Sequence, residues 1–348
     1  MKILSTFSAL LAVAVARTNV MLPLYVPPNS QEWQAAVDAI KKHPTDLDFF
    51  VVINPNSGPK STSDPEGANR GSCNTIKPPE THPYCKDALV HGCNLDWSTK
   101  VAELNGLPNV HTIGYVYSRY GHEKDEEWLP KNPRQWRTRK EIMDDIDEWA
   151  AWDTACTWSS SSANIKINGI WFDETGVDKG NITEFTEMVT YARQAFKRPI
   201  TIVLNPGSNL NNSDLGDGRN YEEAMFGLAD AVVLRETCYT NDPSTSIEPD
   251  GRQDCPGNYN AFDYNTLADG NGMPFHPNLR SKSVVLVHQF HGPPGPGDAG
   301  ALRTQVSGLV SKWGPHSALF TTRSWHSTTI GPADIGSFSD ILAEANKA

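Results

Sequence analysis

Several features are missing from this 348-residue sequence, and each absence narrows the choice of protein class. No two cysteines have the C-x-x-C spacing of common zinc sites, so we do not expect a zinc site. No apolar run approaches the roughly 20 residues that a membrane helix requires. No glycine-rich phosphate loop follows the first predicted strand, which argues against a dinucleotide-binding sheet. Basic residues are outnumbered, 30 against 41 acidic ones, and the net charge of -11 argues against nucleic acid as a partner.

The first residues have the pattern of a secretion signal. Lys2 supplies a positive start, residues 3–15 form a mostly apolar run, and Ala14-Val15-Ala16 has the small-x-small form that signal peptidase accepts. We therefore expect residues 1–16 to be a signal peptide and residues 17–348 to form one domain. That domain is expected to be secreted and monomeric, without a membrane anchor, and either free or associated with the cell wall.

The cysteines and two glycosylation sequons agree with secretion. In an oxidising compartment an even number of cysteines is expected to form disulfides. The six candidates are Cys73, Cys85, Cys93, Cys156, Cys238 and Cys255. Cys238 with Cys255 is the preferred pair, because they are close in sequence and lie in one predicted loop. Asn181-Ile182-Thr183 and Asn211-Asn212-Ser213 are acceptor triplets for N-glycosylation at Asn181 and Asn211.

The chain repeats one unit, in which a short apolar run is followed by turn residues and then by a stretch with helical spacing. Apolar runs without alternation are typical of strands that are covered on both faces, as in parallel sheets. Eight strands are predicted, at 22–26, 49–55, 110–116, 169–174, 200–206, 231–236, 283–290 and 318–322. Helices are predicted between them at 30–43, 94–105, 135–152, 182–196, 221–228 and 301–313, with a last one at 332–346.

Eight such units predict an α/β fold, a closed (β/α)8 barrel. Three long insertions, at 60–92, 118–134 and 237–280, follow the carboxyl ends of predicted strands. In a barrel these βα loops form the face that carries the active site. Since the first and third insertions contain or border five of the six cysteines, we expect disulfides to stabilise long loops on this face.

The predicted strands end in polar residues, which a barrel directs toward its mouth. The sharpest case is Gly169-Ile170-Trp171-Phe172-Asp173-Glu174, where an apolar run ends abruptly in two acids. Because side chains alternate along a strand, Asp173 and Glu174 are expected to point in different directions, one to the centre of the mouth and one to its wall. A third acid, Glu236, ends the predicted sixth strand.

Two carboxyl groups across a bond are the usual machinery of glycosidic cleavage, and Asp173 and Glu236 fit that division. We expect a retaining mechanism, although inversion stays open because sequence does not give the distance between the two groups. A single acid could instead cap a helix or form a surface ion pair. Three acids at the tips of nearby barrel strands favour the catalytic interpretation.

Other residues at the strand tips or just beyond them are candidates for binding a sugar. Tyr25, Tyr115 and Tyr120 could stack on sugar rings, or could simply be buried tyrosines. Asn54 and Asn205 could bind hydroxyl or N-acetyl groups, or could make turns. His288 is interpreted as a groove residue rather than a metal ligand, because no carboxylate stands beside His288 or His291 in the sequence.

These segments also carry a resemblance. The motifs are Leu22-Pro23-Leu24-Tyr25-Val26, Val51-Val52-Ile53-Asn54-Pro55-Asn56-Ser57-Gly58-Pro59, Ile113-Gly114-Tyr115-Val116, 169–174, Asn205-Pro206-Gly207 and Val232-Val233-Leu234-Arg235-Glu236. In this order they resemble the spherulin-4 family, which includes secreted fungal glycoside hydrolases that act on α-1,4-linked galactosamine polymers. Arg235 departs from the apolar residue expected there, and it should point away from the mouth if Glu236 points into it.

The resemblance implies a (β/α)8 barrel and an endo-acting glycoside hydrolase that cleaves the amino-sugar polysaccharide galactosaminogalactan without a cofactor. It further implies Asp173 as nucleophile, Glu236 as acid/base and Glu174 as a supporting carboxylate. Two alternatives stay open. One is a carbohydrate-binding or wall-associated barrel that has lost activity, although such a protein would be expected to lose at least one of these acids. The other is a metal-dependent hydrolase or lyase, which would require a third ligand beside Asp173 and Glu174.

Overall fold

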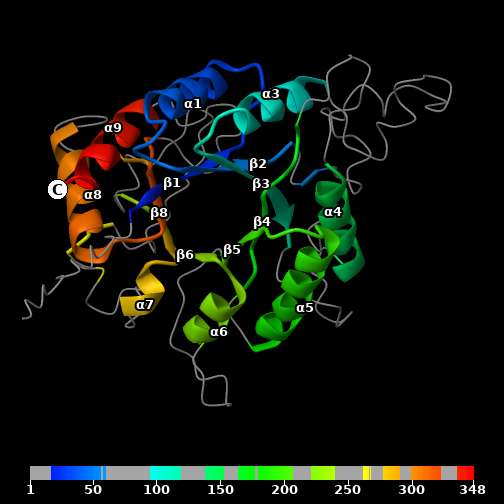
Figure 1. The fold of residues 1–348 in the computed structure, drawn as a ribbon. Coiled ribbons are helices and arrows are strands. Elements are labelled where there is room, and N and C mark those ends of the chain that lie inside the picture. Colours follow the sequence, from blue (N-terminus) through cyan, green and yellow to red (C-terminus); the bar gives the residue numbers. More distant parts are fainter. Residues whose placement is uncertain are drawn as a thin grey trace, which may run out of the picture.

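The computed structural model describes residues 17–55, 58–59, 95–118, 138–152, 164–176, 179–206, 221–239, 262–265, 267, 277–290, 299–322 and 335–348. Within these residues, eight parallel strands form a closed barrel in chain order, with β8 pairing back to β1 (Figure 1). The predicted (β/α)8 barrel is therefore confirmed. The signal-peptide residues 1–16 and the cysteines other than Cys238 lie outside the described residues.

The strands are β1 Asn19–Leu24, β2 Phe49–Ile53, β3 Val110–Tyr117, β4 Gly169–Asp173, β5 Thr201–Asn205, β6 Ala231–Cys238, β7 Ser283–His288 and β8 Ser317–Phe320. The helices are α1 Gln31–Lys42, α3 Leu95–Asn105, α4 Arg139–Ala151, α5 Lys179–Ala195, α6 Tyr221–Leu228, α7 Pro277–Arg280, α8 Ala299–Trp313 and α9 Ile335–Ala345. Helix α7 was not predicted and lies within the predicted third insertion. No helix among the described residues has the length and apolar character needed to cross a membrane.

The strands form because their side chains are buried on both faces. All five residues of β2, Phe-Phe-Val-Val-Ile, are buried, as expected for a strand between the barrel interior and a layer of helices. Helices begin where capping side chains allow it. The Ser30 side chain accepts a hydrogen bond from the Trp33 amide at α1, and Thr138 and Glu141 form a reciprocal capping box at α4.

Gly114 shows how closely the helices pack on the strands. A Cβ atom at this position would lie 2.6 Å from the ring of Trp149, a contact that no side chain tolerates. The same indole donates a hydrogen bond from Nε1 to the carbonyl of Tyr115 at 2.8 Å. These contacts fix α4 against β3, with Gly114 on the face of the strand that packs on the helix. Because side chains alternate along a strand, the next residue, Tyr115, faces the barrel interior.

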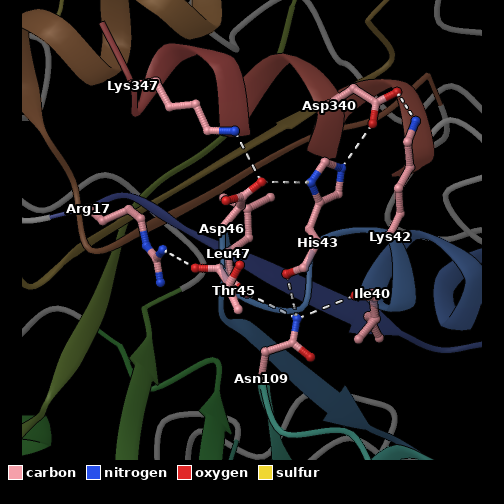
Figure 2. Close-up of polar contacts among 10 residues, drawn as sticks. All are labelled: Arg17, Ile40, Lys42, His43, Thr45, Asp46, Leu47, Asn109, Asp340 and Lys347. Carbon is pink, nitrogen blue, oxygen red and sulfur yellow. Dashed lines mark hydrogen bonds and ion pairs between the residues drawn. The ribbon is translucent and has the colours of Figure 1, made fainter.

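The amino-terminal end of the barrel carries a network of charged and polar residues (Figure 2). His43, at the end of α1, contacts Asp340 of α9 at 2.9 Å through Nε2, and Asp340 also accepts from Lys42 at 2.7 Å. Lys347 donates to Asp46 at 3.1 Å. The buried amide of Asn109 donates to the carbonyls of Ile40, His43 and Leu47. We call Lys42, His43, Asp46, Asn109, Asp340 and Lys347 the basal network. It connects α1 and the loop before β2 to the last helix, α9, and to Lys347 beyond it.

Candidate functional site

The candidate site lies at the opposite end, where the strands end. One side chain from each of five consecutive strands takes part in an unbroken run of polar contacts. Tyr115 Oη donates to Asp173 Oδ2 at 2.5 Å, and Asn205 Nδ2 donates to Asp173 Oδ1 at 2.7 Å. The same Nδ2 donates to Glu236 Oε2 at 2.9 Å, and His288 Nε2 lies 3.2 Å from Glu236 Oε1. We call Tyr115, Asp173, Asn205, Glu236 and His288 the mouth chain.

The separation of the two acids follows from this arrangement. Both hydrogen bonds of Asn205 start at one nitrogen, so Asp173 Oδ1 and Glu236 Oε2 can be no farther apart than the two bond lengths together, about 5.6 Å. An sp² nitrogen directs its two hydrogens about 120° apart, which brings the separation to about 5 Å. Retaining glycosidases hold their two carboxyl groups about 5–5.5 Å apart, and inverting ones hold them about 6.5–9.5 Å apart.

Glu236 reaches the mouth because of an irregularity in β6. The register with β7 shifts between Val233 and Arg235, which is a β-bulge that gives β6 one extra residue. Without it, alternation from the inward-facing Val233 would place Arg235 in the mouth and Glu236 among the helices. The bulge reverses this, and Arg235 is 3% exposed on the outer side of the sheet. The expectation that Arg235 points away from the mouth is met, by a feature that the sequence did not reveal.

Glu174 lies just beyond β4, which ends at Asp173, and it has a left-handed φ of 52°. The strand alternation behind the predicted divergence of Asp173 and Glu174 therefore does not extend to Glu174, although the two side chains contact different partners. Tyr115 and Tyr117 lie on the same face of β3, and Tyr117 Oη donates to Glu174 Oε2 at 3.2 Å. Both acids therefore lie on the mouth side of the barrel, and Tyr117 is a site residue that the sequence reasoning missed.

Backbone strain and extra hydrogen bonds are concentrated at the strand tips. Among the described non-glycine residues with left-handed φ, Glu174 and Gln289 directly follow Asp173 and His288. Such conformations cost about 1–3 kcal/mol each and persist where the surroundings impose them. The amide of Thr175 donates to the carbonyl of Asn205 at 2.9 Å, which extends the β4–β5 ladder beyond the strand ends and holds the site residues rigidly.

The electrostatics of the site set Asp173 apart. Burial and the charge of Glu236 raise the pKa of Asp173 to about 7, and Glu174 adds to this, although the hydrogen bonds from Tyr115 and Asn205 act in the opposite direction. Burial is also the main reason that the pKa values of Tyr25 and Tyr115 are raised. Both tyrosines therefore keep their protons at neutral pH, and Tyr115 remains a donor to Asp173.

The remaining sequence-predicted residues have different positions. Tyr25 is half-buried and packs edge to face on Tyr115, with ring centroids 5.4 Å apart. Asn54 accepts from the amide of Gly58 at 3.1 Å, which supports the turn-making alternative. Tyr120 and the sequon residue Asn211 lie outside the described residues, and Asn181 falls within α5, where its side chain is not described.

Cys238 ends β6 and is disulfide-bonded, but its partner lies outside the described residues, so the pairing with Cys255 stays a prediction. No group of three or more potential metal ligands occurs among the described residues.

Three solved structures are similar to this chain to different degrees. Sph3 from Aspergillus clavatus, in complex with GalNAc, is 22% identical, with a TM-score of 0.60 over 94% of this chain and 98% of that one. A chitinase from Ipomoea carnea is 11% identical, with a TM-score of 0.43 over 94% and 99%. The PgaB glycoside hydrolase domain from Bordetella bronchiseptica is 10% identical, with a TM-score of 0.42 over 94% and 98%. At 22% identity, the likeness to Sph3 concerns the fold alone.

No curated protein matches this sequence. A family model described as spherulation-specific family 4 matches residues 19–77 and 76–328, which include every residue of the mouth chain. The resemblance noted in the sequence is thereby confirmed, and this chain belongs to the spherulin-4 family.

Proposed function

We propose that this protein is a retaining, endo-acting glycoside hydrolase that cleaves polysaccharides containing α-1,4-linked N-acetylgalactosamine and galactosamine. The observation that carries the proposal is the bridge of Asn205 between Asp173 and Glu236, which limits their nearest oxygens to about 5.6 Å. That distance suits direct attack by one carboxylate on the sugar while the other protonates the leaving oxygen. It is too short for a water molecule to be placed between a base and the sugar, as inversion requires.

The protonation of the pair supports the same chemistry. A retaining reaction needs one carboxylate and one carboxylic acid at the start. With the pKa of Asp173 raised to about 7 by burial and by the charge of Glu236, the two acids together hold one proton at weakly acidic to neutral pH. We assign Asp173 as nucleophile and Glu236 as acid/base from the family resemblance. The order of proton loss is a property of the coupled pair and does not by itself distinguish the two roles.

The surroundings suit a sugar ring. Tyr25 and Tyr115 form an aromatic wall beside the two acids, and aromatic faces pack on the apolar C–H faces of pyranose rings. Glu174 lies next to Asp173 and is held by Tyr117, so we propose that it orients substrate or tunes the pair. The choice of an amino-sugar polymer rests on membership of the family and on Sph3, whose structure contains GalNAc.

We also propose that the protein acts outside the cell as a monomer, after removal of residues 1–16. The disulfide at Cys238 supports an oxidising compartment, because disulfides seldom persist in the cytosol. The expected glycosylation at Asn181 and Asn211 belongs to the same proposal.

The test is to incubate the purified protein with purified galactosaminogalactan and to measure new reducing ends, beside Asp173→Ala and Glu236→Ala variants. We expect internal cleavage by the wild type and loss of activity in both variants. Wild-type activity in both variants would refute the mechanism. Cleavage of another α-glycan but not of this polymer would refute only the substrate. Tight binding without cleavage by the wild type would instead support the non-catalytic alternative.

A further inference from the structure

Asn205 holds the central position of the mouth chain, between the two acids. The sequence suggested that it binds sugar hydroxyls or makes a turn, but its contacts indicate another task. A side-chain amide has two N–H hydrogens, and here one is directed to Asp173 and the other to Glu236. At least one of the two acids is an ionised carboxylate, which only accepts, and both contacts start at the same atom of Asn205, so that atom must be the nitrogen and not the oxygen. No N–H of this side chain is left to donate to a substrate.

The bridge is reinforced from both sides. Tyr115 donates to the other oxygen of Asp173, and His288 contacts the other oxygen of Glu236. Each acid is therefore held at both oxygens, with Asn205 as the residue common to both. Asn205 is itself 4% exposed and ends β5, whose backbone is bonded to the β4 tip through Thr175. The amide is thus a rigid spacer and not a mobile surface group.

We infer that Asn205 is the positioning residue that fixes the separation of Asp173 and Glu236 at the value that retention requires, and that it does not bind substrate. The inference rests on the proposed glycosidase function. An apolar residue at this position would donate to neither acid, and the repulsion between the two facing carboxylates could then move them apart.

A positioning role for Asn205 predicts a large effect on kcat and a small effect on KM. Without the bridge, the acids lose their relative position in the transition state, and misplacement of about 1 Å can cost about 100-fold in rate. We expect Asn205→Ala to lower kcat about 100-fold and to change KM less than about threefold. A sugar-binding asparagine would instead raise KM.

The pH profile gives a second measure. The titratable groups that face Asp173 are Glu236, Glu174, Tyr115 and Tyr25. The Asn205 amide holds the pKa of Asp173 below the value that burial and these charges would otherwise give. Its removal should therefore move the alkaline limb of the kcat/KM profile, near pH 7 in the wild type, to higher pH. Loss of a merely structural contact would lower the profile without moving it.

The experiment measures kcat, KM and the pH profile for Asn205→Ala and Asn205→Asp. The Asp variant keeps an acceptor oxygen but loses the donor, so we expect it to be at least as impaired as the Ala variant. Asn168→Ala is the matched control, since Asn168 lies at the opposite end of the barrel and donates to Thr112 at 3.2 Å. Thermal unfolding of each variant shows whether it is folded.

Carboxyl titration by ¹³C NMR in wild type and Asn205→Ala follows the same pair without substrate. The inference therefore remains testable even if the polymer is not cleaved, which would count against the proposed function alone. A raised KM with unchanged kcat, together with an unmoved carboxyl titration, would overturn the inference. An upward shift of the carboxyl titration in Asn205→Ala would support it.

Discussion

The two ends of the barrel use the same residue type in opposite ways. At the basal network, the hydrogen bond from Lys347 lowers the pKa of Asp46, and Lys42 and His43 hold the pKa of Asp340 below its ordinary value although partial burial opposes them. In the mouth chain, burial and a second carboxylate raise the pKa of Asp173 to about 7. The described partners of Asp173 are neutral donors and other acids. The carboxylates of the basal network, which are paired with cations, stabilise the fold, whereas Asp173 with its raised pKa is available for chemistry.

The largest expected effect is on kcat, which should fall when an acid of the mouth chain is replaced but not when an acid of the basal network is replaced. Asp173→Asn and Glu236→Gln keep the shape of each side chain but remove its ability to ionise, and we expect kcat to fall about 10³-fold in each. Asp340→Asn, the same change at the basal network, should leave kcat unchanged. Reducing-end assays on the three variants make the comparison. Full activity in Asp173→Asn would remove the distinction between the two ends.

The next effect should appear in stability at the basal network. Asn109 is 3% exposed and its amide nitrogen donates to three carbonyls, so Asn109→Ala leaves buried acceptors without their donor. We expect a loss of about 1–3 kcal/mol in the free energy of unfolding, with unchanged kcat per folded molecule. Urea unfolding monitored by tryptophan fluorescence measures the free energy of unfolding. An activity assay normalised to the concentration of folded protein measures kcat. A free energy of unfolding equal to that of wild type would show that the hydrogen bonds of Asn109 do not stabilise the fold.

A smaller effect of the opposite sign is expected for Asp173→Asn. Because the pKa of Asp173 is raised in the folded protein, ionisation destabilises the fold progressively between about pH 4 and pH 7, and fully above pH 7. The amide does not ionise, and a shift of about three pKa units corresponds to about 4 kcal/mol, but the amide also replaces one acceptor oxygen of Asp173 by a donor, which costs about 1–3 kcal/mol. The variant should therefore be more stable than wild type by about 1 kcal/mol at pH 8 and should lose this advantage at pH 4. Unfolding curves at the two pH values check the sign. A variant less stable than wild type at pH 8 would contradict the raised pKa.

The smallest effect should come from Asp340→Asn. The lowered pKa of Asp340 means that its ionised form stabilises the fold above pH 4, and that this contribution disappears as the pH falls through the lowered value. Its side chain is 39% exposed, so solvent screens the interaction and we expect a loss of only about 0.5 kcal/mol at pH 7 and none near pH 2. Melting temperatures at both pH values measure it. An equal loss at pH 2 would point to packing and not to charge.

Much of the fold could be predicted because burial leaves a direct trace in sequence. Runs such as Phe49–Ile53 are apolar throughout, and strands covered on both faces need just that pattern. The ends of these apolar runs also predicted where the strands end, and Asp173 and Glu236 were identified as a pair because both lie at such ends. The limits of the strands were less accurate: β1 begins at Asn19, three residues before its predicted start, because Asn19 and Val20 pair with β8. Pairing partners are not visible in one sequence.

What could not be predicted depends on local backbone geometry. The bulge between Val233 and Arg235 decides that Glu236 faces the mouth, and its only trace is a charged residue inside an apolar run. The left-handed φ of Glu174 has no trace in the sequence. Tyr117 could have been found, because it lies two residues after Tyr115 on the same strand face. The bridging role of Asn205 required the register of three neighbouring strands.

The most direct test of the central claim is the configuration of the first product. Incubating the enzyme with an α-1,4-linked N-acetylgalactosamine oligosaccharide in an NMR tube, and recording the anomeric proton signals within minutes, shows the new reducing end before it equilibrates. With Asp173 and Glu236 held about 5 Å apart by one amide nitrogen, the account predicts that the α-anomer appears first. Initial formation of the β-anomer would mean inversion, and would contradict it.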